Sequence, residues 1–565
     1  MRRTAVAEEP NLTFGEKLKY FMAAHWRGVI VVLTPLILLV TVLRPFPPLK
    51  FQWAAFTLLL MAIYWVTECI PLAVTSFFPV VIFPLSDVEN TRDTCRCYTN
   101  DTIIMFVGSL ILASSVEASG FHKRMAYFFV RLIGYSHLKL LLAVCCVTTF
   151  ASMWITNTAA TTMMVPINFA ILKVFEDQKV IKMYEITADG DQIASDTTTC
   201  YFCSVTFSAT IGGIGTLVGT ATNLVLKGLF AAAYPAAPEY LSFPMFSTFT
   251  IPLMIVLEIL LYFNMIIVYF GFLRPGSAVA KASAIPVVAQ EAAKAAIAAD
   301  VKKMGGMTMW EAMVCVLFGG AMLSFFSRSP QLFQGWGDKL ILYHKLKDQK
   351  FIRDSALAMF VSYLMFLLPR ELTFMKSCTA PYKDQLPKSR TYSVLNWAVL
   401  NSQMPFSFSF LLGGGFALST AAKSSGLNDQ LGLYMKTLGG LPNPLIVFIV
   451  GAVVILVTNF ASNVAVCNVF TPIAMQLAKE VKQNPLCYAI SSGIAASFSF
   501  LLPVGTPGNL IAQSAAKIPT GKMIYAGLGP TASCMVVLWL ATMLWAPILW
   551  PDLLILPHWV SSGGR

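Results

Sequence analysis

Long segments without a charged residue recur along the chain, and they constrain its fold more than any other feature. Leu140–Leu172 and Thr437–Ala478 contain no Asp, Glu, Lys or Arg. Each is longer than the roughly 20 residues that an α-helix needs to cross a bilayer. Only 12% of the residues are charged and 56% are hydrophobic, whereas soluble domains carry about 25% charged residues. We therefore expect an all-α, polytopic membrane protein.

The basic residues lie mainly in the segments that connect the apolar runs. The net charge is +12, and Lys and Arg in such segments orient helices by the positive-inside rule and meet anionic lipid. No basic stripe with interleaved aromatic residues is present, so we expect no nucleic-acid partner. The first 27 residues lack the apolar core of a cleavable signal. They predict a cytoplasmic N-terminal segment.

We divide the chain into two membrane-embedded halves. An Ala- and Lys-rich cytoplasmic linker, 274–306, separates a first half, 28–273, from a second half, 307–550. Residues 1–27 and 551–565 flank the halves as terminal segments. The apolar segment Ile103–Val116 is short for a bilayer crossing. We interpret it as a re-entrant hairpin.

Three pairs of motifs indicate an internal repeat. Segments 108–113 and 414–419 are 306 positions apart, as are 156–167 and 462–473, which align Asn157 with Asn463. A third pair, 219–224 and 505–510, is 286 positions apart. Short matches arise easily among small and apolar residues, but these matches include polar residues at membrane depth. Secondary transporters are commonly built from inverted repeats with interrupted helices, and we favour such a duplication.

Polar residues around Asn157 and Asn463 interrupt segments that are otherwise apolar. Backbone groups freed by a helix break cost several kcal/mol in hydrocarbon unless they line a cavity or pack on protein. Half-helices beginning after Thr158 and after Val464 would point N–H groups and a positive dipole end into the gap. The two asparagines add amide donors, while Thr158 and Thr220 add hydroxyls. The pattern favours a site for a di- or trianionic substrate, with a cation at the carbonyl-rich helix ends.

Two Gly-Thr-x-x-Asn loops belong to the same hypothesis. Gly219 and Gly505 permit close backbone approach, and we expect Asn223 and Asn509 to cap the half-helices that follow. The alternative is that Ser, Thr and Asn only join helices, as is common in membranes. Their recurrence at two repeat-related positions favours binding.

Other candidate groups give weaker signals. Glu68 and Glu258 lie in or beside apolar runs, where carboxyl groups are rare and often functional, although Glu68 also fits an interfacial helix end before Pro71. Cys200 and Cys203 form a C-x-x-C pair without a second pair or a nearby His, so we expect no zinc site. No H-E-x-x-H, G-x-S-x-G or P-loop pattern is present. An enzyme is therefore not expected.

Four motifs are specific enough to suggest a family. They are Ser152-Met-Trp-Ile-Thr-Asn-Thr158, Ser462-Asn-Val464, Leu411-Leu-Gly-Gly-Gly-Phe-Ala-Leu418 and Leu502-Pro-Val-Gly-Thr-Pro-Gly-Asn509. Over about residues 25–550 the chain resembles the divalent anion/sodium symporter family, most closely its animal citrate and dicarboxylate branch with the INDY carriers of insects. The resemblance implies a homodimer of inverted-repeat protomers that work by an elevator motion. Ile103–Val116 and Phe406–Leu418 would then be the re-entrant hairpins, beside two broken helices.

The residue pattern and the resemblance together predict the site. The family's paired Ser-Asn-Thr signatures fall on 156–158 and 462–464, where the resemblance implies that carboxylates bind. The predicted substrate-binding residues are Asn157, Thr158, Gly219, Thr220, Ser462, Asn463, Val464, Gly505, Thr506 and Pro507. The predicted remnants of cation sites are Ser152, Thr156, Asn223, Thr458, Ala461 and Asn509.

The sequence departs from the family signature at three positions. Thr156 replaces the first Ser, Val464 replaces the last Thr, and Val218 lies beside Gly219 where a hydroxyl would help to bind a cation. A valine side chain offers no oxygen, so the valines at positions 464 and 218 weaken a sodium site. We therefore favour sodium-independent exchange and expect no cofactor.

The expected function is secondary active transport of citrate and C4-dicarboxylates, such as succinate, across the plasma membrane. The expected partners are the carboxylate substrate, membrane lipid and a second copy of the chain. One alternative is a sodium-coupled symporter of citrate, dicarboxylates or sulfate. A more remote alternative is an anion channel, which would pass far more ions per second and saturate poorly.

Overall fold

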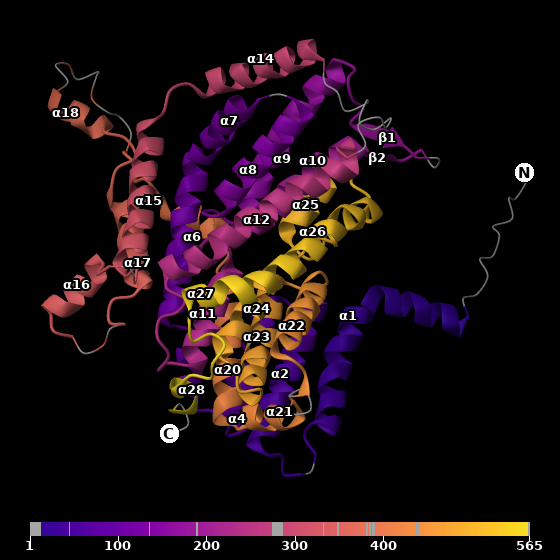
Figure 1. Cartoon of the computed structure of the whole chain (residues 1–565), viewed down its shortest axis with the longest axis vertical. Coiled ribbons are helices and arrows are strands. Elements are labelled where there is room, and N and C mark those ends of the chain that lie inside the picture. The colour runs from indigo at the N-terminus through magenta and orange to yellow at the C-terminus, as the bar shows by residue number, and fades with distance from the viewer. Residues whose placement is uncertain are drawn as a thin grey trace, which may run out of the picture.

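Helices make up almost all of the regular structure, as expected. The computed structural model describes residues 13–44, 46–134, 136–187, 190–273, 286–331, 333–346, 348, 350–379, 382, 386, 390–435 and 440–562. Within these ranges the only sheet is the antiparallel pair β1 (Tyr184–Ile186) and β2 (Gln192–Ala194). Six helices of the described part are long and apolar enough to cross a membrane. The prediction of an all-α, polytopic membrane protein is confirmed (Figure 1).

The described helices of the first half run from α1 to α12. They are α1 (Phe14–Thr41), α2 (Lys50–Thr67), α3 (Leu72–Thr75), α4 (Phe78–Leu85), α5 (Thr91–Arg96), α6 (Asp101–Ser119), α7 (Phe121–Ile133), α8 (His137–Ser152), α9 (Asn157–Asp177), α10 (Asp196–Gly213), α11 (Ala221–Ala233) and α12 (Phe243–Phe270). α1 begins inside the predicted terminal segment because Thr13 and Glu16 form a reciprocal capping box. Residues 1–12 of that segment lie outside the described residues.

The linker and the second half follow. The described part of the linker is the helix α14 (Val287–Met304), while 274–285 lie outside the described residues. The second half contains α15 (Met309–Arg328), α16 (Trp336–Tyr343), α17 (Asp354–Leu367), α18 (Lys376–Thr379), α19 (Trp397–Gln403), α20 (Ser407–Ser424), α21 (Leu427–Met435), α22 (Asn443–Thr458), α23 (Asn463–Glu480), α24 (Pro485–Ala495), α25 (Pro507–Ala516), α26 (Thr520–Leu540) and α27 (Ala546–Leu549). A short helix α28 (His558–Ser562) lies in the predicted C-terminal segment, whose last residues, 563–565, are outside the described ranges.

The internal repeat is visible in the helix boundaries. The helices α6, α7, α8 and α9 begin at 101, 121, 137 and 157, and α20, α21, α22 and α23 begin at 407, 427, 443 and 463, each 306 positions later. α11 and α25 begin at 221 and 507, which are 286 positions apart. The two offsets found in the sequence are therefore also the offsets between equivalent helices.

α8 and α9 form a helical hairpin. The rings of His137 on α8 and Phe175 on α9 are 5.6 Å apart. At the other end of the pair, Ser152 and Asn157 are hydrogen-bonded. The start of α8 thus lies beside the end of α9, and the chain reverses at residues 153–156. A break within one continuous span was expected here, so the predicted position of the break is right but its shape is wrong.

The equivalent helices α22 and α23 fold back in the same way on α24. Asn443, which begins α22, accepts a hydrogen bond from Tyr488, and Thr458 at its end donates to Ala496 O. α23 runs in the opposite direction past α24, because Asn463 at its start contacts Ser497, beyond the end of α24, and the later Thr471 contacts Ser492 within α24. The second hairpin therefore turns at residues 459–462.

The segments predicted as re-entrant hairpins form continuous helices instead. The side chain of Asn100 accepts from Ile103 N, so α6 begins at Asp101 and runs for 19 residues, longer than Ile103–Val116. α20 likewise extends beyond Phe406–Leu418 to Ser424. The fold has two hairpins and two interrupted helices, as predicted, but the hairpins are α8–α9 and α22–α23. The interrupted helices are α10–α11 and α24–α25.

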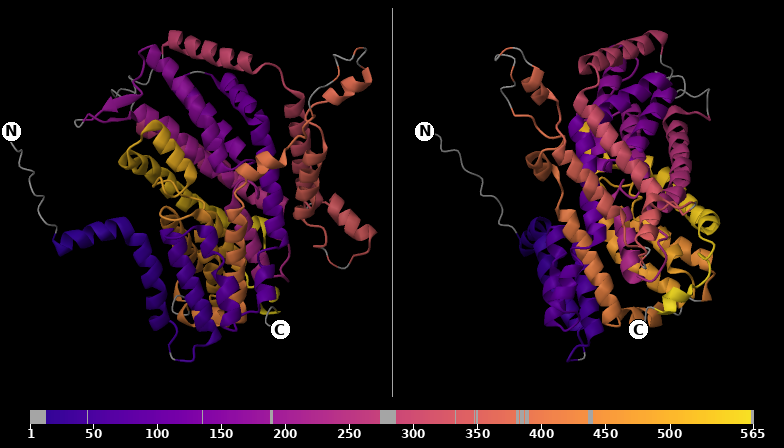
Figure 2. Two further views of the ribbon diagram at one scale, coloured as in Figure 1. Left: turned by 180° about the vertical axis from the view of Figure 1, so that it is seen from behind. Right: turned by 90° about the vertical axis from the view of Figure 1, so that its left-hand side faces the viewer.

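The two repeats interlock in the middle of the molecule. α25 of the second repeat packs on α9 and α10, and α11 of the first repeat packs on α23 and α24. α7, α8 and α9 lie in the upper half of Figure 1, and α20, α22 and α23 in the lower half. The views in Figure 2, turned about the vertical axis, keep this order. The two hairpins thus approach the centre from opposite ends, which fits an inverted repeat.

Candidate functional site

The turn of the first hairpin places Asn157 at the start of a helix. α9 begins at Asn157, two residues before the expected start after Thr158, because Thr156 is its N-cap and its hydroxyl accepts from Ala159 N at 3.3 Å. The Ser152 hydroxyl lies 2.8 Å from Asn157 Oδ1 and 2.6 Å from Ala209 O. Ser152 therefore ties the asparagine to α10 and fixes the orientation of its amide.

The second hairpin turn repeats this arrangement at the equivalent positions. α23 begins at Asn463 after the N-cap Ser462. The Thr458 hydroxyl lies 2.8 Å from Asn463 Oδ1 and 2.6 Å from Ala496 O. Two hydroxyl residues 306 positions apart, Ser152 and Thr458, thus perform the same structural role.

The loops that interrupt α10–α11 and α24–α25 are held by the asparagines of the Gly-Thr-x-x-Asn motifs. Asn223 Nδ2 donates to Gly213 O at 3.0 Å and to Thr216 O at 2.7 Å. Asn509 Nδ2 donates to Ser499 O and Leu502 O, at 3.1 and 3.0 Å.

These bonds correct the expectation that Asn223 and Asn509 cap the following helices. The N-caps are Thr220 and Thr506, and the Thr506 hydroxyl accepts from Asn509 N. The asparagines reach back instead to carbonyls that precede them in the chain: Gly213 O at the end of α10, where helix carbonyls lack a partner within the helix, and Thr216 O, Ser499 O and Leu502 O in the loops.

Each loop packs closely against the hairpin turn of its own repeat. A Cβ atom on Gly219 would lie 2.5 Å from Gly213 O and 3.0 Å from Ser152 O, so only glycine fits there. A Cβ atom on Gly505 would lie 3.2 Å from Asn459 O and 1.8 Å from Ser499 Oγ. We call the group formed by Ser152, Asn157, Gly213, Gly219 and Asn223 cradle 1. Cradle 2 is the equivalent group of Thr458, Asn463, Ser499, Gly505 and Asn509.

The cradles are connected through the interlocked helices. The Thr206 hydroxyl on α10 donates to Asn509 Oδ1 at 2.7 Å. A Cβ atom on Gly508 would lie 3.0 Å from the hydroxyls of Thr161 and Thr206. Cradle 2 is thus fixed to α9 and α10 of the first repeat.

The remaining predicted residues surround the two cradles. Thr158, Thr220 and Ser462 are half-buried, Ala461 and Val464 are buried, and Pro507 is exposed. None of the predicted site residues carries a charge. The groups that could attract an anion here are therefore amides, hydroxyls and the N-terminal ends of α9, α11, α23 and α25.

Comparison with known proteins identifies the family. A family model described as the sodium:sulfate symporter transmembrane region matches residues 23–551. The chain belongs to this family. It is 34% identical to the Drosophila melanogaster protein "I'm not dead yet", over 96% of this chain and 93% of that protein. It is 31% identical to human solute carrier family 13 member 2 and 30% identical to the rat Na(+)/citrate cotransporter, covering 97% and 92% of those proteins and 96% and 91% of this chain.

A solved structure supports the fold. The Alcanivorax borkumensis YdaH transporter matches with a TM-score of 0.51 at 14% identity, over 90% of this chain and 99% of that one. The family and the relatives are transporters. This family member is therefore a multi-pass membrane transporter and not an enzyme.

Sequence reasoning missed Gly213 and Ser499 of the two cradles, and Asn459 beside cradle 2. Asn459 is fully buried, and its Oδ1 accepts from Phe500 N at 3.0 Å and Leu501 N at 2.8 Å. It therefore holds the turn of the second hairpin against the α24–α25 loop. Its position four residues before Asn463 in a charge-free segment was the available signal, but the equivalent residue in the first repeat is Met153.

The weaker candidates lie outside the cradles. Glu258 Oε1 accepts from the Ser208 hydroxyl at 2.7 Å, and Ser208 precedes Ala209, whose carbonyl accepts from Ser152. Glu258 thus supports α10 behind cradle 1. Glu68 is the left-handed C-cap of α2, with a φ of 46°, which agrees with its interpretation as a helix end.

Proposed function

We propose that this transporter carries citrate and C4-dicarboxylates such as succinate across the plasma membrane. The observation that carries the proposal is the pair of equivalent cradles, each with an asparagine amide at a helix N-terminus and no charged side chain. The names of relatives agree with these substrates. They include the rat Na(+)/citrate cotransporter, the Caenorhabditis elegans sodium-dependent low-affinity dicarboxylate transporter 1 and human Na(+)/dicarboxylate cotransporter 3.

In the proposed binding mode, one carboxylate lies at each cradle. The first accepts hydrogen bonds from the Asn157 amide and the N–H groups that begin α9, and the second accepts them from Asn463 and α23. Thr158, Thr220, Ser462 and the loops at Gly219–Thr220 and Gly505–Pro507 complete the site. Helix ends and amides attract a dianion or trianion, and the absence of an arginine clamp favours release on the other side.

The proposed transport cycle moves both cradles together. The two hairpins and the interlocked α10, α11, α24 and α25 would form the moving part, because their packing links the repeats into one unit. Alternating access in inverted-repeat carriers is largely a rigid-body movement of one part against another. We propose an elevator motion in a homodimer.

For the coupling, we propose exchange that does not require sodium. Val464 is buried beside Asn463 and Val218 lies beside Gly219, so neither position supplies a side-chain oxygen for a cation. The second candidate is sodium-coupled symport, which is favoured by the names of several relatives. A third is sulfate transport, which is favoured by the family description.

Flux into proteoliposomes tests the proposal. We expect saturable uptake of labelled citrate when the vesicles contain unlabelled citrate, in sodium and in choline buffer alike. Uptake only in sodium would support symport instead. Uptake of labelled sulfate that excess citrate does not inhibit would favour sulfate transport, and poorly saturating flux at very high turnover would indicate a channel. Absence of saturable citrate and succinate uptake in both buffers would reject the proposal.

A single substitution tests the explanation of the coupling. Val464→Thr restores a hydroxyl at the position where the family signature has one. We expect sodium to stimulate citrate uptake by this variant more than uptake by the unmodified protein. Equal uptake by the two proteins at every sodium concentration would show that Val464 does not determine the coupling.

A further inference from the structure

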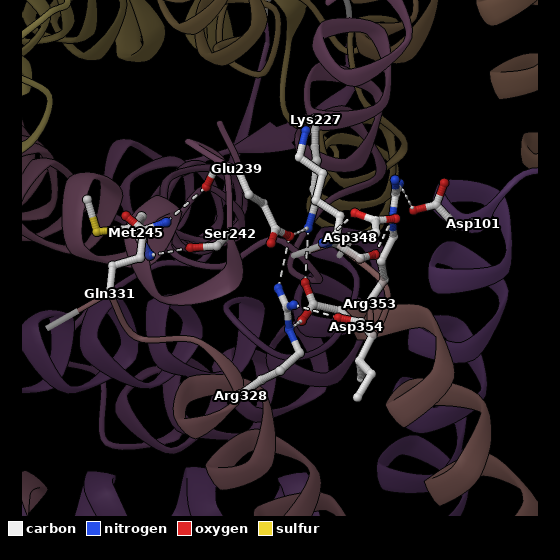
Figure 3. Close-up of polar contacts among 12 residues, drawn as sticks. Asp101, Lys227, Glu239, Ser242, Met245, Arg328, Gln331, Asp348, Arg353 and Asp354 are labelled. Atoms are coloured by element: carbon white, nitrogen blue, oxygen red, sulfur yellow. Dashed lines mark hydrogen bonds and ion pairs between the residues drawn. The ribbon is translucent and has the colours of Figure 1, made fainter. Parts of the chain in front are cut away.

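Four charged residues, two buried and two half-buried, form a cluster beside the middle of α11 and the loop that follows it (Figure 3). Lys227 lies on α11 and Glu239 in the loop that follows it, while Arg328 ends α15 and Asp354 begins α17. The side chains of Arg328 and Asp354 are each 2% exposed, and those of Lys227 and Glu239 are 17% and 23% exposed. The cluster holds two cations and two anions, so its formal charges cancel.

The four ion pairs divide into two kinds. We call α11 with the loop through Glu239 the α11 segment, and the chain from α15 to α17 the α15–α17 segment. Two ion pairs connect these segments, Lys227 Nζ–Asp354 Oδ2 at 3.0 Å and Arg328 Nη2–Glu239 Oε1 at 2.9 Å. Arg328 Nε–Asp354 Oδ1 at 2.5 Å and Lys227 Nζ–Glu239 Oε1 at 3.8 Å lie within one segment each. Each segment therefore contributes one cation and one anion that already contact each other.

This distribution matters because a buried charge that loses its partner is costly. Removal of one member of a buried ion pair strongly destabilises a protein, because the other charge is left buried and uncompensated. If the α11 segment moved away from α15 and α17, however, the cluster would separate into two neutral pairs, Lys227–Glu239 and Arg328–Asp354. No charge would lose its counter-ion. An interface of this kind can open and close repeatedly.

The contacts around the cluster are of the same reversible kind. Lys350 Nζ donates to Pro235 O and Ala237 O, and Gln331 Nε2 donates to Glu239 O, so polar side chains on one side meet backbone carbonyls on the other. The carbonyls can be hydrated when the contacts break. A cavity lies along this boundary, lined in part by Lys227, Glu239, Lys350 and Asp354. It leaves space for the side chains to move when the two segments separate.

The cluster is also mechanically linked to cradle 1. α11 begins after Thr220 in the loop of cradle 1, and Lys227 lies seven residues further along the helix. At about 1.5 Å per residue, this separation is only about 10 Å. A rigid helix therefore transmits the docking of Lys227 to the loop that contains Gly219 and Thr220.

We propose that this cluster is a latch, which holds α11 against α15 and α17 in one state of the transport cycle and opens by division into two neutral ion pairs. The proposal rests on the proposed function, because it assigns α11 to the moving part. The latch biases the population of two states that expose the cradles to opposite sides of the membrane.

Two double variants weaken the latch without leaving a single uncompensated charge. Lys227→Met with Glu239→Gln removes one neutral pair. Lys227→Glu with Glu239→Lys keeps the net charge but places like charges across the boundary. The matched control is Arg353→Gln with Asp101→Asn, because that ion pair, at 2.7 Å, connects α6 to the start of α17 and does not involve the α11 segment.

Citrate exchange is then measured from each face, in vesicles of one orientation. A bias between two states predicts that KM rises at one face and falls at the other, by about fivefold or more, and most in the charge-exchanged variant. The control should show no such split. Equal changes at both faces, or the same split in the control, would overturn the latch.

A second measurement does not depend on transport. In hydrogen–deuterium exchange without substrate, the backbone of residues 234–242 should exchange faster in both latch variants than in the unmodified protein and in the control. Unchanged exchange there would also overturn the proposal. If the unmodified protein failed to transport citrate while this difference in exchange was present, the proposed substrate would be wrong and the latch would stand.

Discussion

The two cradles share one backbone plan but are held together by different side chains. In cradle 1 the tie comes from the loop, because the Thr216 hydroxyl donates to Met153 O in the hairpin turn at 2.6 Å. In cradle 2 it comes from the turn, because Asn459 accepts from two backbone N–H groups of the chain that enters the loop. The same contact between turn and loop has therefore been built from opposite sides.

A second difference concerns Gly213 and its equivalent residue in the second repeat, Ser499. Gly213 in cradle 1 leaves no room for a side chain, since a Cβ atom would lie 2.2 Å from Asn157 Oδ1. The equivalent residue in cradle 2 is Ser499, which is fully buried and whose hydroxyl has no hydrogen-bond partner among the described residues. The comparison teaches that the hydroxyl–asparagine pairs, Ser152–Asn157 and Thr458–Asn463, are the shared feature, while the neighbouring positions have diverged.

The largest expected effect comes from the shared feature itself. Asn157→Ala and Asn463→Ala should each reduce citrate transport by about 10-fold to 100-fold, because each removes a hydrogen bond to a charged group worth about 1.5–3 kcal/mol. Uptake is compared at equal amounts of correctly folded protein, judged by gel filtration. A strong loss in only one of the two variants would show that the cradles do not contribute equally.

The next effect tests the divergence. Gly213→Ala should displace the Asn157 amide and lower transport nearly as much as Asn157→Ala. Ser499→Ala at the equivalent position should leave transport within about twofold, because it removes a buried hydroxyl that makes no hydrogen bond to any described residue. Transport rates of the two purified variants give the comparison, and similar rates would contradict it.

The glycines of the two loops extend this test. Gly219→Ala would meet the backbone oxygen of Gly213, which cannot move away, whereas Gly505→Ala would meet mainly the hydroxyl of Ser499. We expect Gly219→Ala to lower transport, though less than Asn157→Ala does, and Gly505→Ala to be partly rescued when Ser499→Ala is added. The test is a double-mutant cycle on uptake rates. An absence of rescue would mean that the remaining approaches, 3.1 Å to Ser499 Cβ and 3.2 Å to Asn459 O, are already limiting.

A smaller effect concerns stability rather than transport. Asn459→Leu leaves Phe500 N and Leu501 N without their acceptor, at a cost of about 1–3 kcal/mol for each group. Thr216→Val removes one hydrogen bond to Met153 O and should cost about 0.5–1.5 kcal/mol. Asn459→Leu should therefore lower the thermal unfolding midpoint in detergent clearly more. The reverse order would show that the tie in cradle 1 is the stronger one.

The sequence predicted the location of both cradles but not their shape. The offsets of 306 and 286 positions identified Asn157, Asn463 and both Gly-Thr-x-x-Asn loops, because a duplicated chain keeps its spacing. Whether the chain reverses or continues at Asn157 depends on packing against α10, which no local pattern encodes. Asn459 was missed for a related reason. Its partners are backbone N–H groups about 40 residues away, and Met153 carries no equivalent amide.

The smallest expected effect tests the link between the repeats. Asn509 Oδ1 accepts the Thr206 hydroxyl at 2.7 Å, whereas Asn223 Oδ1 is buried without a partner among the described residues. Thr206→Val should slow citrate exchange by a few-fold, since it removes one neutral hydrogen bond of about 1 kcal/mol. Ser492→Ala, at the position equivalent to Thr206, should change it little, because the Ser492 hydroxyl contacts Tyr488 O and Thr471 instead. If Ser492→Ala slowed exchange as much as Thr206→Val, both repeats would contribute equally to the connection between the cradles. Asn223 Oδ1 would then accept a hydrogen bond from Ser492 in another state of the transport cycle.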